Sequence, residues 1–221
     1  MGKLRPDKYD VWAGVIILAG TLLRYLLIAQ GWPAAYNDEG TLGLMALHVA
    51  YQGAHPLLYY GQNYLGSLEA YIGAGFFQLL GPSTFALRLG LLPLFALFLT
   101  CIYLLASLLY TKSLALISLI VLDLGSPDIF LRQLMAAGGT PEMLFFTALL
   151  LLLTAWLILS APMPENARDG PSGKNDESSM PLRAGDSARH LRWTRLVAFG
   201  AWGVVAGLDL WSHLLCLPFV L

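Results

Sequence analysis

Long apolar runs separated by polar stretches dominate this chain. The long runs cover residues 11–29, 84–110, 113–124, 143–160 and 196–221, and a shorter run at 70–80 ends at Gly81-Pro82-Ser83. A helix needs about 20 predominantly apolar residues to span a bilayer. The pattern therefore predicts an all-α, polytopic transmembrane helix bundle.

The composition excludes the common soluble classes. Of the 221 residues, 57% are hydrophobic and 12% are charged, whereas a soluble domain has about 45–50% apolar and about 25% charged residues. A net charge of −1 gives no basic field for nucleic acid. Cys101 and Cys216 both lie in apolar runs, so the sequence predicts neither a disulfide framework nor a metal cluster.

The basic residues predict the topology. The N-terminus is basic, and the polar stretch 161–195 carries six of the 13 basic residues, so both should be cytoplasmic. An even number of crossings must then lie between them, although five apolar runs do. We assign the shortest, 70–80, to a short helix on the outer surface. The alternative makes 70–80 a crossing and removes 113–124 from the count.

The chain is thus expected to have three parts. Residues 1–160 form an N-terminal transmembrane module with short surface helices in an outer catalytic loop at 30–83. Residues 161–195, rich in proline, serine, glycine and mixed charge, form a flexible cytoplasmic loop. Residues 196–221 form the next transmembrane helix, which ends without a polar cap, so we expect the chain to be the N-terminal part of a longer protein.

The most informative segment is Tyr36-Asn37-Asp38-Glu39-Gly40, which follows the first apolar run. Asn37 or Asp38 can cap a helix over 39–51, because acids and amides are favoured at helix N-termini. A carboxylate at the water–lipid boundary can also take a proton from an acceptor hydroxyl. The capping role and the catalytic role are compatible, since a helix N-terminus holds a side chain in a fixed position.

Other polar residues gather on the same predicted side. Gln62, Asn63 and Glu69 stand among tyrosines, where interface anchoring and sugar binding both remain open. Arg24 interrupts the first apolar run, and it either snorkels to the outer phosphates or binds a lipid phosphate. Arg88 and Arg132 have the same two interpretations.

Asp209 and His213 are four residues apart and share a helix face. The two side chains could form either a structural hydrogen bond or a proton relay. An alternative function is a polytopic transporter or flippase that uses Arg24, Asp209 and His213 in the bundle. Paired half-helices broken at matching positions are not seen, which disfavours it. A third interpretation is a non-catalytic membrane scaffold. No P-loop, HExxH or CxxC motif occurs.

Taken together, these features resemble the GT-C glycosyltransferases. More narrowly they resemble glycosyltransferase family 39, the protein O-mannosyltransferases and the aminoarabinose transferases of lipid A. The resemblance covers Arg24 to about Leu92. Its strongest parts are Asn-Asp-Glu-Gly at 37–40, Gly-Gln-Asn-Tyr-Leu-Gly-Ser-Leu-Glu at 61–69 and Leu-Gly-Pro-Ser-Thr-Phe-Ala-Leu-Arg-Leu at 80–89, with Gly-Leu-Asp-Leu-Trp-Ser-His at 207–213 similar to a later helix of bacterial members.

The resemblance implies an inverting GT-C-type transferase in a cell membrane, the plasma membrane of a bacterium, with its active site on the outer side. The donor would be a polyprenyl-phosphate sugar, and the acceptor a hydroxyl or amine on a lipid, glycan or protein. Asp38 would be the catalytic base and Glu39 a second acid that shapes the site. The residues expected to bind substrate are Arg24, Gln62, Asn63, Glu69, Arg88, Arg132 and His213.

The resemblance also bears on cofactors. No metal ligands are expected, although some members of the wider superfamily use a divalent cation held by carboxylates. Some relatives carry a Lys-Pro pair that meets the donor phosphate, where this chain has His55-Pro56. The phosphate contact would therefore fall to Arg24, Arg88 or Arg132.

Overall fold

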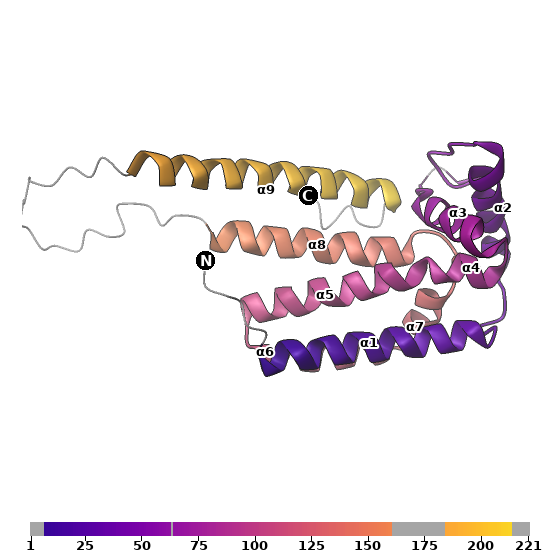
Figure 1. Ribbon diagram of the computed structural model, residues 1–221, viewed down its shortest axis with the longest axis horizontal. Coiled ribbons are helices and arrows are strands. Elements are labelled where there is room, and N and C mark those ends of the chain that lie inside the picture. The colour runs from indigo at the N-terminus through magenta and orange to yellow at the C-terminus, as the bar shows by residue number, and fades with distance from the viewer. Residues whose placement is uncertain (1–6, 63, 161–183, 214–221) are drawn as a thin grey trace, which may run out of the picture.

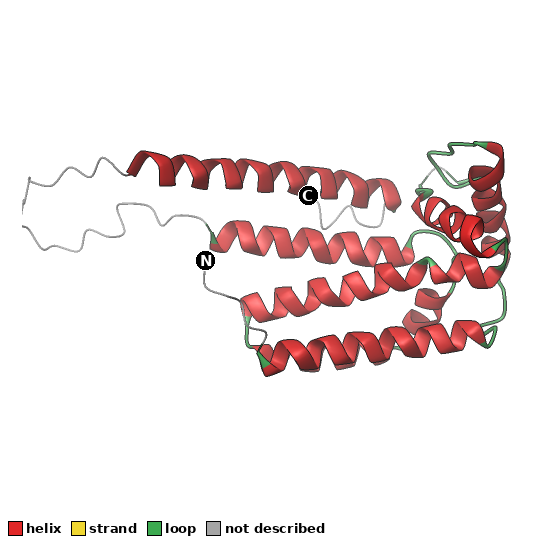
Figure 2. Ribbon diagram, in the orientation of Figure 1, coloured by secondary structure: helices red, strands yellow, loops and turns green. Residues whose placement is uncertain are grey.

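The computed structural model describes residues 7–62, 64–160 and 184–213. The described residues form nine α-helices with no named strand (Figures 1 and 2), which confirms the predicted all-α class. The helices are α1 (Lys8–Ala29), α2 (Asn37–Gln52), α3 (Leu68–Leu80), α4 (Thr84–Leu89), α5 (Leu91–Leu109), α6 (Lys112–Leu124), α7 (Pro127–Leu134), α8 (Thr140–Leu159) and α9 (Ala184–Ser212).

The long helices form one bundle. α5 packs against α1, α6 and α8, and α9 packs on α8. The short helices α2, α3, α4 and α7 gather at one end of this bundle, which we call the pocket end (Figure 1). The short helix predicted for 70–80 is α3, which packs against α2 and α4 at the pocket end.

Three helical segments are long and apolar enough to cross a membrane: α1, the continuous stretch Thr84–Leu109 formed by α4 and α5, and α8. A fourth would be the pair α6 and α7, which is bent by 75°. α6 alone has 13 residues, or roughly 20 Å of helix, too short to cross a bilayer without its bent partner. The apolar run at 113–124 predicts a crossing by itself, because apolar composition does not reveal the bend.

α9 begins at Ala184, inside the stretch assigned to a flexible loop. Past Pro181 the sequence is rich in alanine, arginine and leucine, which are good helix formers. The low hydrophobicity of this segment concealed its helical preference. The predicted loop at 161–183, the end of the last run at 214–221 and the candidate residue Asn63 lie outside the described residues.

A buried arginine holds the bent pair to α1. The guanidinium of Arg24 donates to Asp123 Oδ1 at 2.7 Å, to the Asp123 carbonyl at 2.8 Å and to Gln133 Oε1 at 2.8 Å. It also lies over the rings of Phe95 and Phe130, 3.7 and 4.5 Å from their centroids. Arg24 is 0% exposed, so it neither snorkels nor reaches a lipid phosphate here. It ties α1 to the end of α6 and to α7.

The close approach of α1 and α6 at this point depends on a glycine. A Cβ on Gly20 would lie 2.0 Å from Asp123 Oδ1, and Arg24 holds that carboxylate in place. We expect Gly20→Val to lower the thermal unfolding temperature of the purified protein, because overpacking costs about 1–3 kcal/mol. Gly14→Val on the same helix is the control, since nothing lies within 4 Å of its Cβ. Equal effects of the two substitutions would contradict the packing argument.

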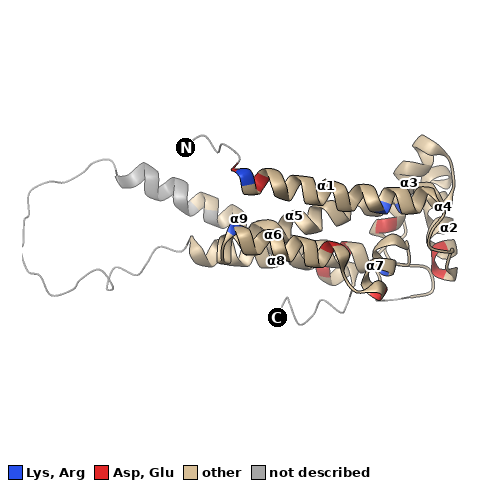
Figure 3. Ribbon diagram, turned by 90° about the horizontal axis from the view of Figure 1, so that it is seen from below, with Lys and Arg blue, Asp and Glu red and all other residues tan. Residues whose placement is uncertain are grey.

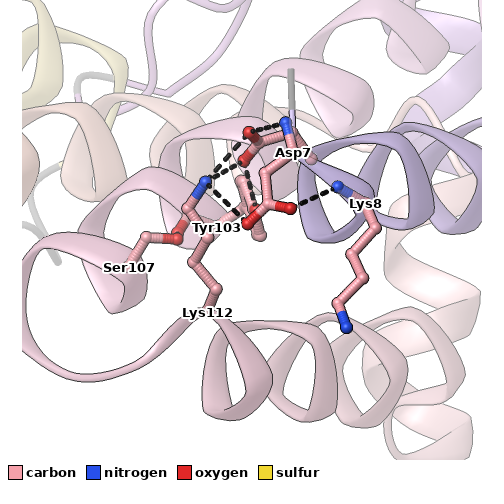
Figure 4. A network of polar contacts seen from close by, with 6 residues as sticks. Asp7, Lys8, Tyr103, Ser107 and Lys112 are labelled. Carbon is pink, nitrogen blue, oxygen red and sulfur yellow. Dashed lines mark hydrogen bonds and ion pairs between the residues drawn. The ribbon is translucent and has the colours of Figure 1, made fainter. Parts of the chain in front are cut away.

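Polar contacts at the opposite end of the bundle fix the start of α1 (Figure 4). Asp7 and Asp10 form a capping box. Lys112 Nζ donates to both oxygens of Asp10 at 2.9 Å, and the Tyr103 hydroxyl donates to Asp10 at 2.7 Å. In Figure 3 most of the coloured charged residues accordingly lie towards the two ends of the bundle.

Candidate functional site

The pocket end contains a cavity of about 510 Å³, within the range of small-molecule sites. Its walls come from the loop after α1, the start of α2, the segment before α3, α7, the loop before α8 with the start of α8, and the residue after α9. The lining residues are Tyr36, Asp38, Gln62, Tyr64, Leu65, Asp128, Leu131, Arg132, Met135, Ala137, Gly138, Thr140 and His213.

Asp38 lies in the first turn of α2 and lines the pocket. The hydroxyl of Tyr59 donates to its backbone carbonyl at 2.9 Å, so a neighbouring segment fixes its position. The predicted cap at Asn37 or Asp38 is wrong. Tyr36 occupies the N-cap position, and its N–H donates to the Glu39 carboxylate at 3.1 Å. Asp38 does not cap the helix, and its half-buried carboxylate faces the pocket.

Glu39 is buried behind the pocket, and both of its carboxylate oxygens accept hydrogen bonds. Arg88 donates to it through Nε and Nη2, both at 2.7 Å, and the Ala136 N–H donates at 3.0 Å. Burial raises the pKa of Glu39, but these donors and the Tyr36 amide outweigh burial and hold the pKa below its ordinary value. Glu39 therefore joins α2, α4 and the loop before α8 as a charged anchor.

The three predicted phosphate-binding arginines occupy different environments. Arg24 is buried in the bundle, and Arg88 is held by Glu39 and by the Pro33 carbonyl at 2.7 Å. Arg132 is exposed and lines the pocket together with Asp128, one helical turn earlier on α7. Within the described part of the chain, Arg132 is the arginine that lines this pocket.

His213 lines another part of the pocket wall. Leu65 pairs with His213 in an isolated bridge, and the Gly66 N–H donates to the Ser212 carbonyl at 3.1 Å. The Tyr64 ring meets the His213 ring edge-on at 6.4 Å. Burial lowers the pKa of His213, which favours the neutral imidazole at neutral pH.

Asp209 lies deeper in the bundle than His213. The Asp209 carboxylate accepts a hydrogen bond from the Thr147 hydroxyl of α8 at 3.0 Å, and Asp209 is 0% exposed. This hydrogen bond joins α8 to α9, and the pairing of Asp209 with His213 stays a prediction.

Glu69 is buried beneath the wall of the pocket. One carboxylate oxygen accepts the Gly138 N–H at 3.2 Å, and the other has no hydrogen-bond donor among the described residues. Burial raises the pKa of Glu69 to about 7. Gly138 itself lines the pocket, so Glu69 supports the wall rather than facing the cavity.

The structure thus brings four predicted residues to one cavity: Asp38, Gln62, Arg132 and His213. The others with described positions, Arg24, Glu39, Glu69 and Arg88, do not line it. Sequence reasoning missed Tyr36, Tyr64, Asp128 and Thr140 as lining residues. The spacing of Asp128 and Arg132 after Pro127, at a helix start, is a signal that could have identified that wall.

No group of three or more histidine, cysteine, aspartate or glutamate side chains in the described residues is arranged to hold a metal ion. Comparisons with protein-family models, curated proteins and solved structures found no match to this chain.

Proposed function

We propose that the protein is a membrane glycosyltransferase that moves a sugar from a polyprenyl-phosphate donor to a hydroxyl or amine at the outer face of a cell membrane. The observation that carries this proposal is the pocket at one end of an apolar bundle, lined by both Asp38 and Arg132. A lipid-linked donor would reach such a pocket from the bilayer, and a polar acceptor would reach it from water.

Asp38 is the proposed general base. A half-buried carboxylate mounted on a helix can accept a proton from an acceptor hydroxyl or ammonium group. Glu39 is a poor candidate for this role, because four donors already occupy its oxygens. Its proposed contribution is to hold the first turn of α2, and with it Asp38, in place.

Arg132 is the proposed partner of the donor phosphate. A guanidinium matches phosphate oxygens with paired N–H donors, and Arg132 is exposed in the pocket. Tyr36, Tyr64 and Gln62 line the same cavity and supply ring faces and an amide for a sugar.

In the proposed reaction, the acceptor oxygen or nitrogen loses its proton to Asp38 and attacks the anomeric carbon. The bond from that carbon to the phosphate oxygen breaks, and the lipid phosphate leaves with its electron pair. The attack comes from the face opposite the leaving group, so the configuration inverts. Arg132 stabilises the charge that develops on the phosphate.

The transporter alternative has less support. It required Arg24, Asp209 and His213 to line a path. His213 lines the pocket, but Arg24 and Asp209 are fully buried and bound to protein groups. Neither lines a described pocket.

The test compares native protein with Asp38→Asn in membranes given a panel of radiolabelled polyprenyl-phosphate sugars. Removal of a general base costs about 10²–10⁴-fold in rate, so label transfer should fall at least ~100-fold at equal expression. Asp128→Asn removes a different pocket carboxylate and should keep most of the transfer.

Transfer that survives in Asp38→Asn would remove Asp38 as the base. An equal loss in the Asp128 variant would indicate a general effect of pocket charge. Absence of transfer by the native protein with every donor would contradict the proposed function.

A further inference from the structure

Two glutamates lie buried side by side beneath the pocket wall. Glu69 is in the first turn of α3 and Glu142 is in the first turn of α8; they are 3% and 0% exposed. Three of their four carboxyl oxygens have no hydrogen-bond donor among the described residues: Glu69 Oε1, Glu142 Oε1 and Glu142 Oε2. Buried polar atoms normally have partners, so this cluster needs a physical explanation.

The two carboxyl groups are close enough for the charge of one to act on the other. The electrostatic influences on Glu142 come from the Glu69 carboxyl and from the backbone N–H of Glu69. That N–H does not reach hydrogen-bond geometry with either Glu142 oxygen. The two helix N-termini therefore converge on a pair of carboxyl groups.

Among the residues that the structure describes, the neighbouring arginines supply no free cation to this pair. Arg88 of α4 is committed to Glu39 of α2, and Arg132 of α7 is exposed in the pocket. The neighbouring elements and loops also carry titratable groups: Tyr59, Tyr64, Tyr71, His48, Tyr51, Asp38, Asp128, Asp209 and His213. Burial favours the neutral form of His213, and Asp209 is bonded to Thr147.

The charges of the pair determine its protonation. Two adjacent carboxylates in a buried site cannot both ionise cheaply. Each helix N-terminus contributes roughly half a positive charge, so two N-termini match one negative charge. A pair with one proton has that charge, and its single O–H can bridge two of the oxygens that otherwise lack partners.

From this geometry we infer that Glu69 and Glu142 share one proton and that the protonated pair positions the Gly138–Gly139 wall of the pocket. Both glutamates are positioning residues, because neither lines the cavity. The inference concerns the pocket used by the proposed function, but its tests require no transferase activity.

The link to the wall is specific. Glu69 accepts the Gly138 N–H, and both glycines have positive φ, +94° and +82°. A Cβ on Gly139 would lie 2.9 Å from a His213 ring carbon, so this wall is closely packed against the end of α9. Loss of the shared proton would place two negative charges under it and displace the wall.

Infrared spectroscopy of the full chain in lipid nanodiscs tests the shared proton. Burial raises the pKa of Glu69 to about 7, so the native protein should show the carbonyl band of a protonated carboxyl group up to at least that pH. Glu142→Gln replaces one acid by an amide that can donate to Glu69, so the band should be lost or titrate at lower pH. Asp128→Asn, which changes an exposed carboxylate, should leave the band unchanged.

Hydrogen exchange of a peptide spanning residues 135–140 tests the effect on the wall. After correction for the intrinsic pH dependence of exchange, the native protein should lose protection there as the pH rises above about 7. Glu142→Gln should keep the same protection across this range, because no second charge can form. A purely structural role for the pair would not produce this difference in pH dependence.

Two results would overturn the inference. One is a native spectrum without a protonated carboxyl band between about pH 5 and pH 9, which would show that the pair is ionised; this measurement needs no variant. The other is a band unaffected by both Glu69→Gln and Glu142→Gln, which would assign it to another carboxyl. Failure of label transfer alone would contradict the proposed function and leave both measurements intact.

Discussion

Replacement of the buried Arg24 by methionine is expected to destabilise the bundle by about 3 kcal/mol, because it leaves the partly buried Asp123 carboxylate without its cation. Methionine keeps the length of the side chain but none of its donors. The Asp123 carboxylate, the Asp123 carbonyl and Gln133 Oε1 would all lose a hydrogen bond. Thermal unfolding of the purified protein in nanodiscs measures the loss.

The matched control removes both charges. Asp123→Leu alone should also be costly, since it leaves Arg24 buried and unpaired. The double variant Arg24→Met/Asp123→Leu should recover a large part of the loss, because an apolar replacement of a buried ion pair is often close to neutral. A double variant as unstable as the sum of the two single variants would show that the ion pair is not the source of the effect.

This network also explains what the sequence could not predict. Arg24 is conspicuous in an apolar run, but its partner Asp123 is 99 residues away. Nothing local connects the two positions. The bend between α6 and α7 likewise depends on this contact, since Arg24 binds the Asp123 carbonyl near the end of α6 and Gln133 on α7.

Helices that depend on local pattern were predicted well. α1, α8 and the stretch formed by α4 and α5 coincide with long apolar runs, and α3 matches the short run before Gly81. α9 was placed too late, because residues 184–195 are polar while still being good helix formers. Apolar content identifies spans, whereas helix propensity sets where a polar extension begins.

Only the part of the candidate site that has a local sequence signal was predicted. Asp38 was prominent because two acids follow an apolar run, and it lines the pocket. The sequence pattern gives Glu142 no role in a site, because an acid next to Pro141 at a helix start has an ordinary explanation. Its burial against Glu69 is a tertiary fact with no local signal.

The second large effect is expected at Arg88. Arg88→Met should cost about 3–5 kcal/mol, because Glu39 would remain buried and charged without its guanidinium. Label transfer should fall as well, since Glu39 holds the first turn of α2 and the Ala136 amide beside the pocket. Thermal unfolding and label transfer measured on the same preparations report both effects.

The pH dependence of this loss identifies its cause. The donors lower the pKa of Glu39, so in the native protein the contribution of the ion pair is present above the ordinary glutamate value of 4.5 and is lost as the pH falls through the lower folded value. Without Arg88 the burial penalty raises the pKa of Glu39, and Arg88→Met should instead gain stability relative to the native protein as the pH falls. Arg88→Lys keeps the charge but cannot reproduce the paired Nε and Nη2 contacts, so it should lie between the two. A lysine variant as stable as the native protein would show that charge alone, without the paired geometry, is sufficient at this position.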